Sequence, residues 1–326
     1  MIWPSYLELN RSGELKRRAE ALSRRYANCD LCPRRCGVDR IQGELGSCAS
    51  RSAVAVASYT PHHGEEPPIS GARGSGTIFF ANCNLRCVYC QNHQISQLGE
   101  AARRHEISLD RLAEIMLELQ DAGCHNINFV SPTHFVPSIV EGVRRAADRG
   151  LRIPLVYNTN AYDSVEVLRL LEGVIDIYMP DIKYADPQSG ETLSRAPGYP
   201  AAARAAIAEM FRQTGELDLD EEGVARRGML VRHLVLPGGL AGSRESLRWL
   251  RDRISPRISL SLMAQYYPAH RAAGFPPLHR RVSLAEYLEA TDALEELGLE
   301  EGWVQSHEDA PDAYRPDFSR DRPFEL

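Results

Sequence analysis

Short apolar runs alternate with helix-like segments through most of the chain, and this alternation limits the fold more than any other feature. We assign six runs to strands, at residues 77–80, 126–130, 154–157, 174–179, 229–235 and 258–263. The segments between them carry apolar residues at the spacing of an amphipathic helix. Strands that alternate with helices form parallel βαβ units with right-handed crossovers, so the sequence predicts an α/β fold.

The number of units favours an open barrel. Neighbouring βαβ units can curl into a closed eight-stranded barrel, but the sequence supplies only six, so we predict a partial (β/α)6 TIM-like barrel. A flat, doubly wound sheet remains an alternative on the pattern alone. Helices are expected from the cap at Ser108 as far as Gly123, and over residues 165–171, 243–253 and 283–296.

The two ends of the chain differ from this alternating region. An amphipathic helix is predicted over residues 11–27, ahead of a Pro- and Gly-rich loop at 59–76. The charged segment 216–227 is expected to form an exposed insertion, and the polar tail after residue 304 to be irregular. We therefore predict a four-cysteine N-terminal module with its linker, a barrel, and a C-terminal helix with its tail, at residues 1–72, 73–270 and 271–326.

Composition and charge argue against two kinds of partner. The formal net charge is −6 at pH 7, whereas non-specific binding of nucleic acid needs a basic surface, so nucleic acid is not an expected partner. The longest apolar stretches, such as residues 76–81, are too short to span a bilayer, so no membrane association is expected. Residues 1–10 lack the basic flank and apolar run of a secretory signal, and the cytoplasm is the expected location.

Cysteines are concentrated in one part of the sequence. Seven of the 8 lie between residues 29 and 90, in two tight groups, and the remaining one is Cys124. Disulfides are common in small secreted domains, but this chain is neither small nor visibly secreted. In a reducing compartment, clustered thiolates more often bind a metal. We interpret Cys124 as a packed thiol.

The second cysteine group has the spacing C-x3-C-x2-C and directly follows the first predicted strand. Cys83, Cys87 and Cys90 can supply three ligands of a four-iron cubane. The fourth iron then has no protein ligand, which is the property that keeps a catalytic metal site open. A zinc site completed by a remote ligand and a set of core thiols are the alternatives.

This segment resembles the radical S-adenosylmethionine (SAM) superfamily, including the aromatic Tyr89 immediately before the third cysteine. The resemblance implies a [4Fe–4S] cluster on Cys83, Cys87 and Cys90, with SAM on the open iron. In that family the reduced cluster cleaves SAM to methionine and a 5′-deoxyadenosyl radical, which abstracts hydrogen from a substrate. It also implies an electron donor such as flavodoxin or ferredoxin.

Over residues 75–270 the sequence is similar to the activating enzymes of glycyl radical enzymes, such as that of pyruvate formate-lyase. One position departs from that pattern. Residues 131–133 read Ser-Pro-Thr where the family has Gly-Gly-Glu for the SAM amino group. The departure leaves open whether Asn128, Ser131 or Thr133 makes these hydrogen bonds.

Other polar residues follow the predicted strands, where barrel sites form. Asn-Thr-Asn after the third strand resembles the family's Thr-Asn-Gly, and Asp-Ile-Lys after the fourth resembles its Asp-Leu-Lys near the SAM ribose and carboxylate. An Arg on the fifth strand also matches, as does a His after the sixth that the family places near adenine. The resemblance therefore assigns SAM contacts to Asn158, Thr159, Asp181, Lys183, Arg232 and His270.

The first cysteine group, C-x2-C-x3-C-x11-C, supplies four thiolates at Cys29, Cys32, Cys36 and Cys48. Four ligands complete either a tetrahedral site or a cubane, and glycines between the third and fourth cysteines supply turns. The pattern also resembles a branch of activase-like radical SAM proteins. Zinc, a rubredoxin-like iron and an auxiliary iron–sulfur cluster all fit, with disulfides as the alternative. We predict a second metal centre and favour iron–sulfur.

A polar stretch lies between the two cysteine groups. It contains His62, His63, Glu65 and Glu66, which could bind substrate or shuttle protons. An exposed polar loop is the favoured interpretation, because the surrounding residues are rich in Pro and Gly.

The sequence predicts an enzyme that abstracts hydrogen by radical SAM chemistry. As an activase it would act on a glycine of a protein partner, and the alternative is radical modification of a small molecule or peptide. A different class is a non-catalytic iron–sulfur electron carrier or redox sensor. Such a protein would need neither an open iron nor the set Asp181, Lys183 and Arg232.

Overall fold

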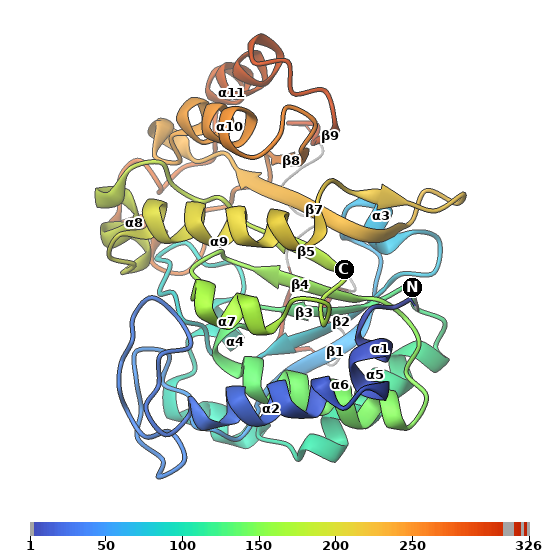
Figure 1. Cartoon of the computed structure of the whole chain (residues 1–326). Helices are drawn as coiled ribbons and strands as arrows, with labels where there is room; N and C mark the ends of the chain where they lie inside the picture. Colours follow the sequence, from blue (N-terminus) through green and yellow to red (C-terminus); the bar gives the residue numbers. More distant parts are fainter. Residues whose placement is uncertain (1–2, 309–315, 321–322, 325–326) are drawn as a thin grey trace.

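A single mixed sheet forms the centre of the protein in the computed structural model, which describes residues 3–308, 316–320 and 323–324 (Figure 1). Its strands follow the order β1-β2-β3-β4-β5-β7-β8-β9, with β6 paired to β7. The strands are β1 (Val56–His62), β2 (Ser75–Phe80), β3 (Ile127–Val130), β4 (Leu155–Thr159), β5 (Ile177–Pro180), β6 (Asp218–Leu219), β7 (Ala225–Leu234), β8 (Ser259–Met263) and β9 (Gly302–Val304).

The winding of the sheet identifies it as a partial barrel. From β2 to β9 every neighbouring pair on this path is parallel, and the strands follow one another in chain order without a reversal. A doubly wound sheet reverses its order at a switch point, so that alternative is excluded. Within the described residues the path ends at β1 and at β9, so the barrel is open between them, as predicted.

The longer helices cover the outer face of this sheet (Figure 1). The helices are α1 (Tyr6–Arg11), α2 (Glu14–Arg24), α3 (Pro67–Ser70), α4 (His93–Ser96), α5 (Leu109–Asp121), α6 (Val136–Asp148), α7 (Val165–Leu170), α8 (Pro187–Ser194), α9 (Tyr199–Thr214), α10 (Ser243–Arg253) and α11 (Leu284–Glu296). Short 3-10 segments occur at Gly99–His105, Thr133–Phe135, Pro237–Gly239 and Ala272–Gly274.

The predicted strands and caps agree closely with this arrangement. All six predicted runs coincide with parallel strands, within a few residues at each end. Ser108 accepts a hydrogen bond from the backbone of Arg111 and starts α5, and Ser283 starts α11 with a capping box. Local periodicity and caps were sufficient here because each strand is buried as a continuous apolar run.

Three segments differ from the prediction. The loop expected at 59–76 contains most of β1 and all of α3, because β1 is an edge strand that tolerates Pro61 and whose side chains from Ser58 to His62 are half-buried or exposed. The helix expected over 11–27 is two helices, since Gly13 adopts φ 80 between them. The insertion at 216–227 folds back as the short strand β6 against β7.

The segments before and after the barrel pack on opposite parts of it. Helix α2 lies against α6, and the Tyr26 hydroxyl bonds to Ser138 of that helix at 2.9 Å. At the other end, β9 adds to β8 in parallel. The described part of the tail then returns to β2, where the rings of Phe318 and Phe324 pack on Phe79.

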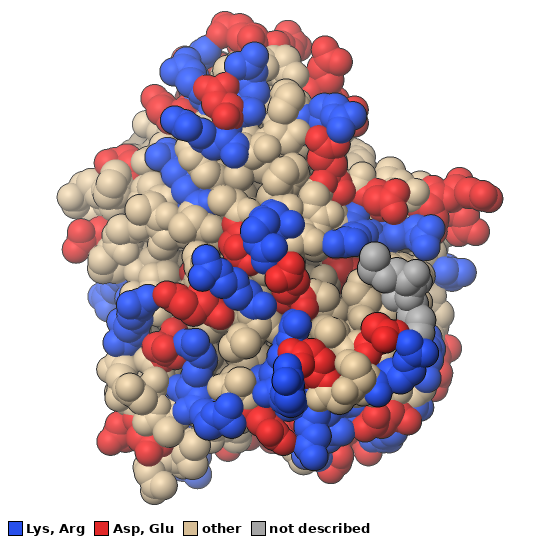
Figure 2. All heavy atoms as spheres, in the orientation of Figure 1, with Lys and Arg blue, Asp and Glu red and all other residues tan. Residues whose placement is uncertain are grey.

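Two surface properties complete the description. Basic and acidic side chains are interspersed over the face drawn in Figure 2, without one large patch of a single sign. Among the described helices, none combines the length and the apolar composition that a membrane crossing requires.

Candidate functional site

A cavity of about 960 Å³ opens at the carboxyl ends of the parallel strands. Its wall is formed by side chains at or just after the ends of the parallel strands, together with part of the β1–β2 connection. Among its lining residues are His62, His63, Glu65, Glu66, Phe79, Cys83, Cys87, Cys90, Ser131, Asn158, Thr159, Asn160, Asp181, Lys183, Arg232, Ser261 and Phe324.

The loop after β2 presents three free thiols to this cavity. Strand β2 is buried throughout and ends at Phe80, and two residues later Asn82 adopts a left-handed backbone (φ 65) where the cysteine loop begins. Each thiol has a polar neighbour: Asn160 donates to Cys83 at 3.4 Å, while the serine hydroxyls of Ser194 and Ser96 lie 3.0 Å from Cys87 and 3.2 Å from Cys90. The thiols predicted to hold a cluster therefore share one cavity wall.

These thiols fit a cluster better than a single ion. Burial raises the pKa of Cys87 to about 12, with the Lys183 ammonium acting in the opposite direction, and burial also raises the pKa of Cys90. Thiols in such surroundings become ligands only when a metal replaces their protons. Among the described residues, no three Cys, His, Asp or Glu side chains approach closely enough to hold one ion. In a cubane each thiolate binds its own iron, so a wider separation is required.

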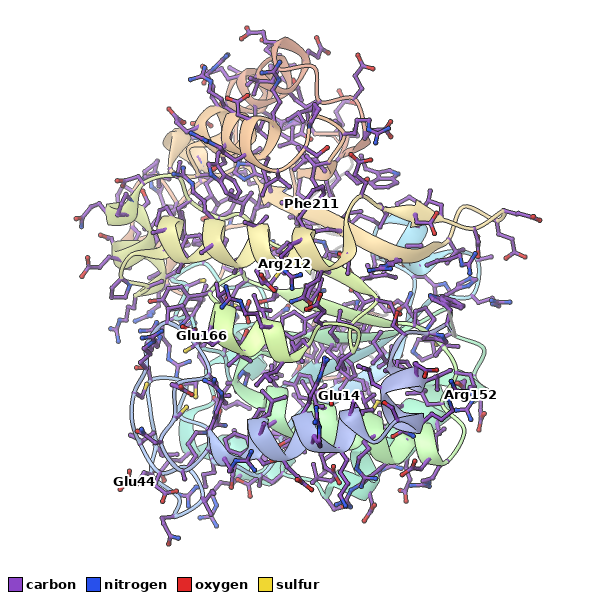
Figure 3. The ribbon with its side chains drawn as sticks, viewed as in Figure 1. Glu14, Glu44, Arg152, Glu166, Phe211 and Arg212 are labelled. Atoms are coloured by element: carbon purple, nitrogen blue, oxygen red, sulfur yellow. The ribbon has the colours of Figure 1, made fainter. Side chains whose placement is uncertain are left out.

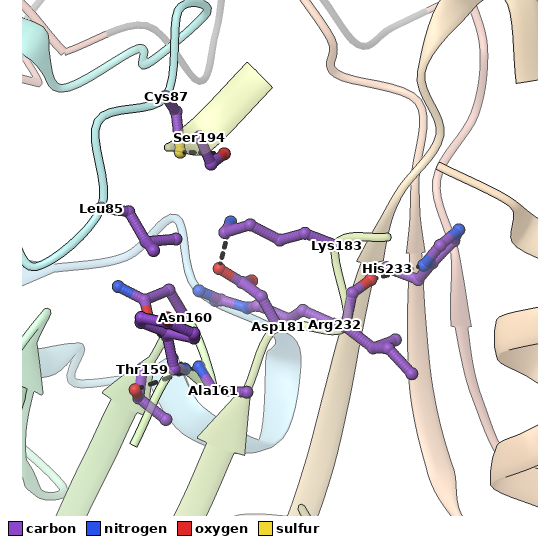
Figure 4. Close-up of polar contacts among 12 residues, drawn as sticks. Leu85, Cys87, Thr159, Asn160, Ala161, Asp181, Lys183, Ser194, Arg232 and His233 are labelled. Carbon is purple, nitrogen blue, oxygen red and sulfur yellow. Dashed lines mark hydrogen bonds and ion pairs between the residues drawn. The ribbon is translucent and has the colours of Figure 1, made fainter. Parts of the chain in front are cut away.

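An ion pair at the end of β5 faces the thiols (Figure 4). The Lys183 ammonium donates to the Asp181 carboxylate at 2.6 Å. Burial alone would lower the pKa of Lys183, but Asp181 and Cys87 outweigh it and the pKa is raised. The Tyr199 hydroxyl fixes this turn, because it contacts the backbone oxygens of Asn160 and Asp181 and accepts from the Lys183 amide. A charged pair is thus held rigidly beside the cluster loop.

The deeper end of the cavity has a charged floor. Arg232 of β7 donates to Glu66 at 2.8 Å and also pairs with Glu65, and both carboxylate side chains are only 7% exposed. Asn128 of β3 donates to Glu65 at 2.9 Å. Burial alone would raise the pKa of Glu66, but the Arg232 guanidinium outweighs it and the pKa is lowered. The interpretation of Glu65 and Glu66 as part of an exposed loop is therefore wrong.

The strand ends next to the thiols supply further polar groups. Ser131 follows β3 with a left-handed backbone (φ 54) and lines the cavity, as do Asn158 and Thr159 at the end of β4. Thr159 donates to the buried Asp163 carboxylate, whose pKa is raised by burial. Thr133 does not line the cavity: it is buried behind Thr159, with its hydroxyl 3.4 Å away.

One predicted SAM contact lies elsewhere. His270 is exposed, does not line the cavity, and stacks on His93 with ring centroids 5.0 Å apart. Thr133 and His270 are thus the two predicted SAM contacts that do not line the cavity, and the remaining six all do. The difference arises because the chain after β8 turns outward at His270, where φ is 55.

The four cysteines of the first group lie outside this cavity. Cys29, Cys32, Cys36 and Cys48 are free thiols that do not contribute to its lining. All 8 cysteines are free, so the disulfide alternative has no support from the structure. Sulfur atoms gather in the loop whose tip carries Glu44, at the edge of the barrel (Figure 3).

Apart from Tyr89, which belongs to the cysteine motif, several side chains that shape the site carried no sequence signal. Tyr89 and Tyr184 share a hydrogen bond of 2.6 Å, and Tyr184 bonds to Ser194 at 2.6 Å, so the cluster loop is joined to α8. His233 is fixed between the Ile182 carbonyl and a serine of α10. Isolated tyrosines and serines occur throughout the chain, and only their tertiary neighbours distinguish these.

Comparisons with known proteins agree with the chemistry of the thiols. The profile of the radical SAM superfamily matches residues 77–238. The uncharacterised protein MJ0674 of Methanocaldococcus jannaschii is 30% identical over 300 residues, covering 90% of this chain and 82% of that protein. MJ0808 of the same organism is 24% identical over 178 residues, covering 50% of this chain and 51% of that protein.

Two solved structures share part of the fold. TYW1 with a lysine–pyruvate adduct bound superposes with a TM-score of 0.45 and 11% identity, covering 72% of this chain and 77% of that one. HydG, a maturase of the [FeFe]-hydrogenase, gives a TM-score of 0.47 and 14% identity, covering 73% and 53%.

Proposed function

The chain belongs to the radical SAM superfamily, and from this premise we propose that it abstracts hydrogen from a small polar substrate bound in the barrel cavity. The observation that carries the proposal is the charged floor of Glu65, Glu66 and Arg232, which faces the same cavity as the three thiols. Membership of the superfamily supplies the SAM-cleaving chemistry, and the floor supplies a charged surface that can recognise a substrate.

Each residue of the site has a task that its contacts support. Cys83, Cys87 and Cys90 would hold the cluster. When bound, the cluster supplies one electron that cleaves SAM to methionine and a 5′-deoxyadenosyl radical. Asp181 and Lys183 offer an anion and a cation at one strand end, which suits ribose hydroxyls and a carboxylate. Ser131 and Asn158 offer neutral hydrogen-bond partners nearby.

The size and charge of the cavity support a small, polar substrate. Its volume of about 960 Å³ is near the upper end for ligand pockets, which leaves room for a second ligand beside SAM. Glu65 and Glu66 carry one more charge than Arg232 neutralises, so the floor favours a group such as an ammonium or a hydrogen-bond donor. Phe324 lines the cavity and lies 4.0 Å from the ring of His62, which narrows the route for a protein loop.

An activase reaction on a glycine of a partner protein is the second candidate. It is favoured by the Asn-Thr-Asn and Asp-Ile-Lys sequences, which resemble those of activating enzymes. The departure at residues 131–133 weakens that likeness. A non-catalytic electron carrier is disfavoured, because a carrier has no use for a large cavity beside its cluster.

The test is anaerobic incubation of the reconstituted protein with SAM and dithionite, followed by measurement of 5′-deoxyadenosine. We expect slow product formation from the protein alone and faster formation with the low-molecular-mass filtrate of a cell extract. Stimulation by the macromolecular fraction alone would favour the activase. No product from a protein with an intact, reduced cluster would favour the electron carrier.

A variant of the floor sharpens the same assay. In Glu65→Gln we expect the stimulation by the filtrate to be lost while the slow, unstimulated cleavage of SAM continues. The exposed Glu20→Gln substitution on α2 is the matched control and should retain both. Equal stimulation of the two variants would remove the floor from substrate recognition.

A further inference from the structure

The thiols of the N-terminal module form a group of their own. Backbone hydrogen bonds fold this loop so that its cysteines approach one another: the Gly37 amide donates to the Cys29 carbonyl at 3.0 Å, the Arg35 amide to the Cys32 carbonyl at 3.0 Å, and the Ser47 amide to the Cys36 sulfur at 3.4 Å. The return of the chain is tight, because a side chain at Gly46 would come within 3.0 Å of the Cys36 sulfur. The turn through Gly46 thus brings the fourth cysteine back toward the first three.

A buried arginine points into this group without a carboxylate partner. Arg40 is 1% exposed, and its Nη1 lies 4.0 Å from the Cys29 sulfur. Two backbone carbonyls and the face of Tyr26 satisfy part of the guanidinium, but its Nε has no partner among the described residues. The Cys29 sulfur is the group of this module that lies beside the guanidinium, so an anionic centre held by these cysteines would compensate the buried cation.

This requirement indicates thiolates, and thiolates on four neighbouring cysteines indicate a metal centre. Neutral thiols would leave Arg40 as a buried cation that no carboxylate among the described residues compensates. A tetrathiolate centre carries negative charge and removes that cost. As with the catalytic set, no three of these cysteine side chains approach closely enough to hold one metal ion. A multi-iron cluster therefore suits both sets.

The module is joined directly to the catalytic loop. Arg86 donates to the carbonyl of Ser47, next to Cys48, at 2.6 Å and to the carbonyl of Cys83 at 2.9 Å. One guanidinium thus connects the backbone next to Cys48 with the backbone of Cys83.

A second bridge runs in parallel. Arg34 of the module donates to the Asn84 carbonyl at 2.7 Å. The side chain of Asn84 accepts from Asn160 at 2.8 Å, and Asn160 also reaches the Cys83 sulfur at 3.4 Å. The two cysteine groups are therefore connected through short polar contacts, while the module stays outside the substrate cavity.

We propose that Cys29, Cys32, Cys36 and Cys48 hold a second iron–sulfur cluster through which electrons enter the catalytic cluster. The position excludes contact with SAM, because none of the four lines the cavity. Cys32 and Cys36 are only half-buried, so a protein donor can approach from the outside. The proposal rests on the proposed function only for the identity of the electron acceptor.

The transfer needs no bond to form or break in the module. A one-electron donor protein, flavodoxin or ferredoxin in chemical class, reduces the second cluster and is itself oxidised. The second cluster then passes the electron to the catalytic cluster and returns to its oxidised state. The catalytic cluster uses that electron to cleave one SAM.

The first test uses the unaltered full chain, reconstituted anaerobically. We expect about eight irons per chain, from two four-iron clusters, and two electron paramagnetic resonance signals after reduction. SAM should change one signal and leave the other unchanged. About four irons with a single, SAM-sensitive signal, or zinc bound in the module, would overturn the proposal.

The second test compares electron donors. In a Cys32→Ser, Cys36→Ser double variant, the SAM-sensitive signal and dithionite-driven cleavage of SAM should remain, because dithionite is small enough to reach the catalytic cluster. Cleavage driven by reduced flavodoxin should fall to the rate measured without donor. Cys124→Ala, a buried thiol remote from both groups, is the control and should lose neither.

The outcomes separate this proposal from the proposed function. Full flavodoxin-driven cleavage in the double variant would refute electron entry through the module, even if radical SAM activity is intact. Absence of cleavage with dithionite in the unaltered chain would refute the proposed function, while two spectroscopic signals would still support a second cluster.

Discussion

The two cysteine groups of this chain differ in what their sulfurs face. Cys83, Cys87 and Cys90 follow a buried strand and open into a cavity lined by charged strand-end residues. The first group lies in a loop outside the barrel, around the buried guanidinium of Arg40. Three thiolate ligands would leave one iron of a cubane open for SAM, whereas four would leave none. We therefore propose that cysteines hold the catalytic cluster in one region and supply it with electrons in the other.

The largest effect is expected from a substitution that disrupts the catalytic cysteine group alone. Cys87→Ala should abolish cleavage of SAM with any reductant and remove about four irons per chain, since a cubane held by two thiolates is not retained. The SAM-insensitive signal of the module should persist. Iron analysis and 5′-deoxyadenosine formation measure both parts, and a Cys87→Ala variant that still cleaves SAM would contradict the assignment.

A second change tests how much the ion pair between Glu66 and Arg232 stabilises the protein, and whether its loss leaves the module unaffected. Glu66→Gln leaves Arg232 with a weakened partner in a buried environment, and breaking such a pair costs roughly 3–5 kcal/mol. We expect the free energy of unfolding, measured with urea on the full chain, to fall by up to this amount. The spectrum of the module should not change. Glu296 forms an exposed ion pair with Arg244, and the control substitution Glu296→Gln should change the free energy of unfolding little.

A third change addresses SAM recognition. Asp181→Ala and Lys183→Ala should each weaken SAM binding by about 1–3 kcal/mol, the usual cost of losing a charge-assisted hydrogen bond. Iron content should stay the same in both groups. Lys16→Ala, the exposed lysine of α2, is the control. Unchanged SAM affinity in both barrel variants, measured by titration of the catalytic signal, would remove this pair from the site.

The smallest expected effect concerns the residue between the two regions. His134 bonds the Ala81 carbonyl of the catalytic loop at 3.0 Å, and its own carbonyl accepts from Arg40 at 2.7 Å. Burial lowers the pKa of His134 from 6.5 to about 3. As the pH falls, the His134 imidazole binds a proton in the unfolded chain before it does so in the folded chain. The stabilising contribution of neutral His134 is therefore complete above pH 6.5 and is lost as the pH falls toward 3.

The pH dependence gives a direct measurement. At pH 5.5 the loss relative to neutral pH is about 1.4 kcal/mol for this one group. His134→Gln should lower stability at pH 7.5 but show a flatter decline between pH 7.5 and 5.5 in urea unfolding. His279→Gln provides the control at an exposed histidine. Parallel declines in the two variants would show that His134 does not titrate as proposed.

Much of the fold followed from local pattern because the barrel strands are buried on both faces. Such strands appear as continuous apolar runs, and helix caps such as Ser108 and Ser283 act within one turn of the chain. Strand β1 could not be found in this way, since an edge strand alternates in polarity and accepts proline. The charged floor was missed for a different reason. Glu65 and Glu66 resemble a polar loop in the sequence, and their ion-pair partner Arg232 is far away along the chain.

The sequence by itself determined that three potential cluster ligands lie on one short loop, because the spacing C-x3-C-x2-C fixes their proximity, and its resemblance to the radical SAM superfamily implied the chemistry. Tertiary structure decided everything that depends on distant partners. It brought Asp181, Lys183 and Arg232 to the same cavity and left His270 outside it. It also buried Arg40 against the first cysteine group, since the burial of a charge depends on packing that no local pattern encodes.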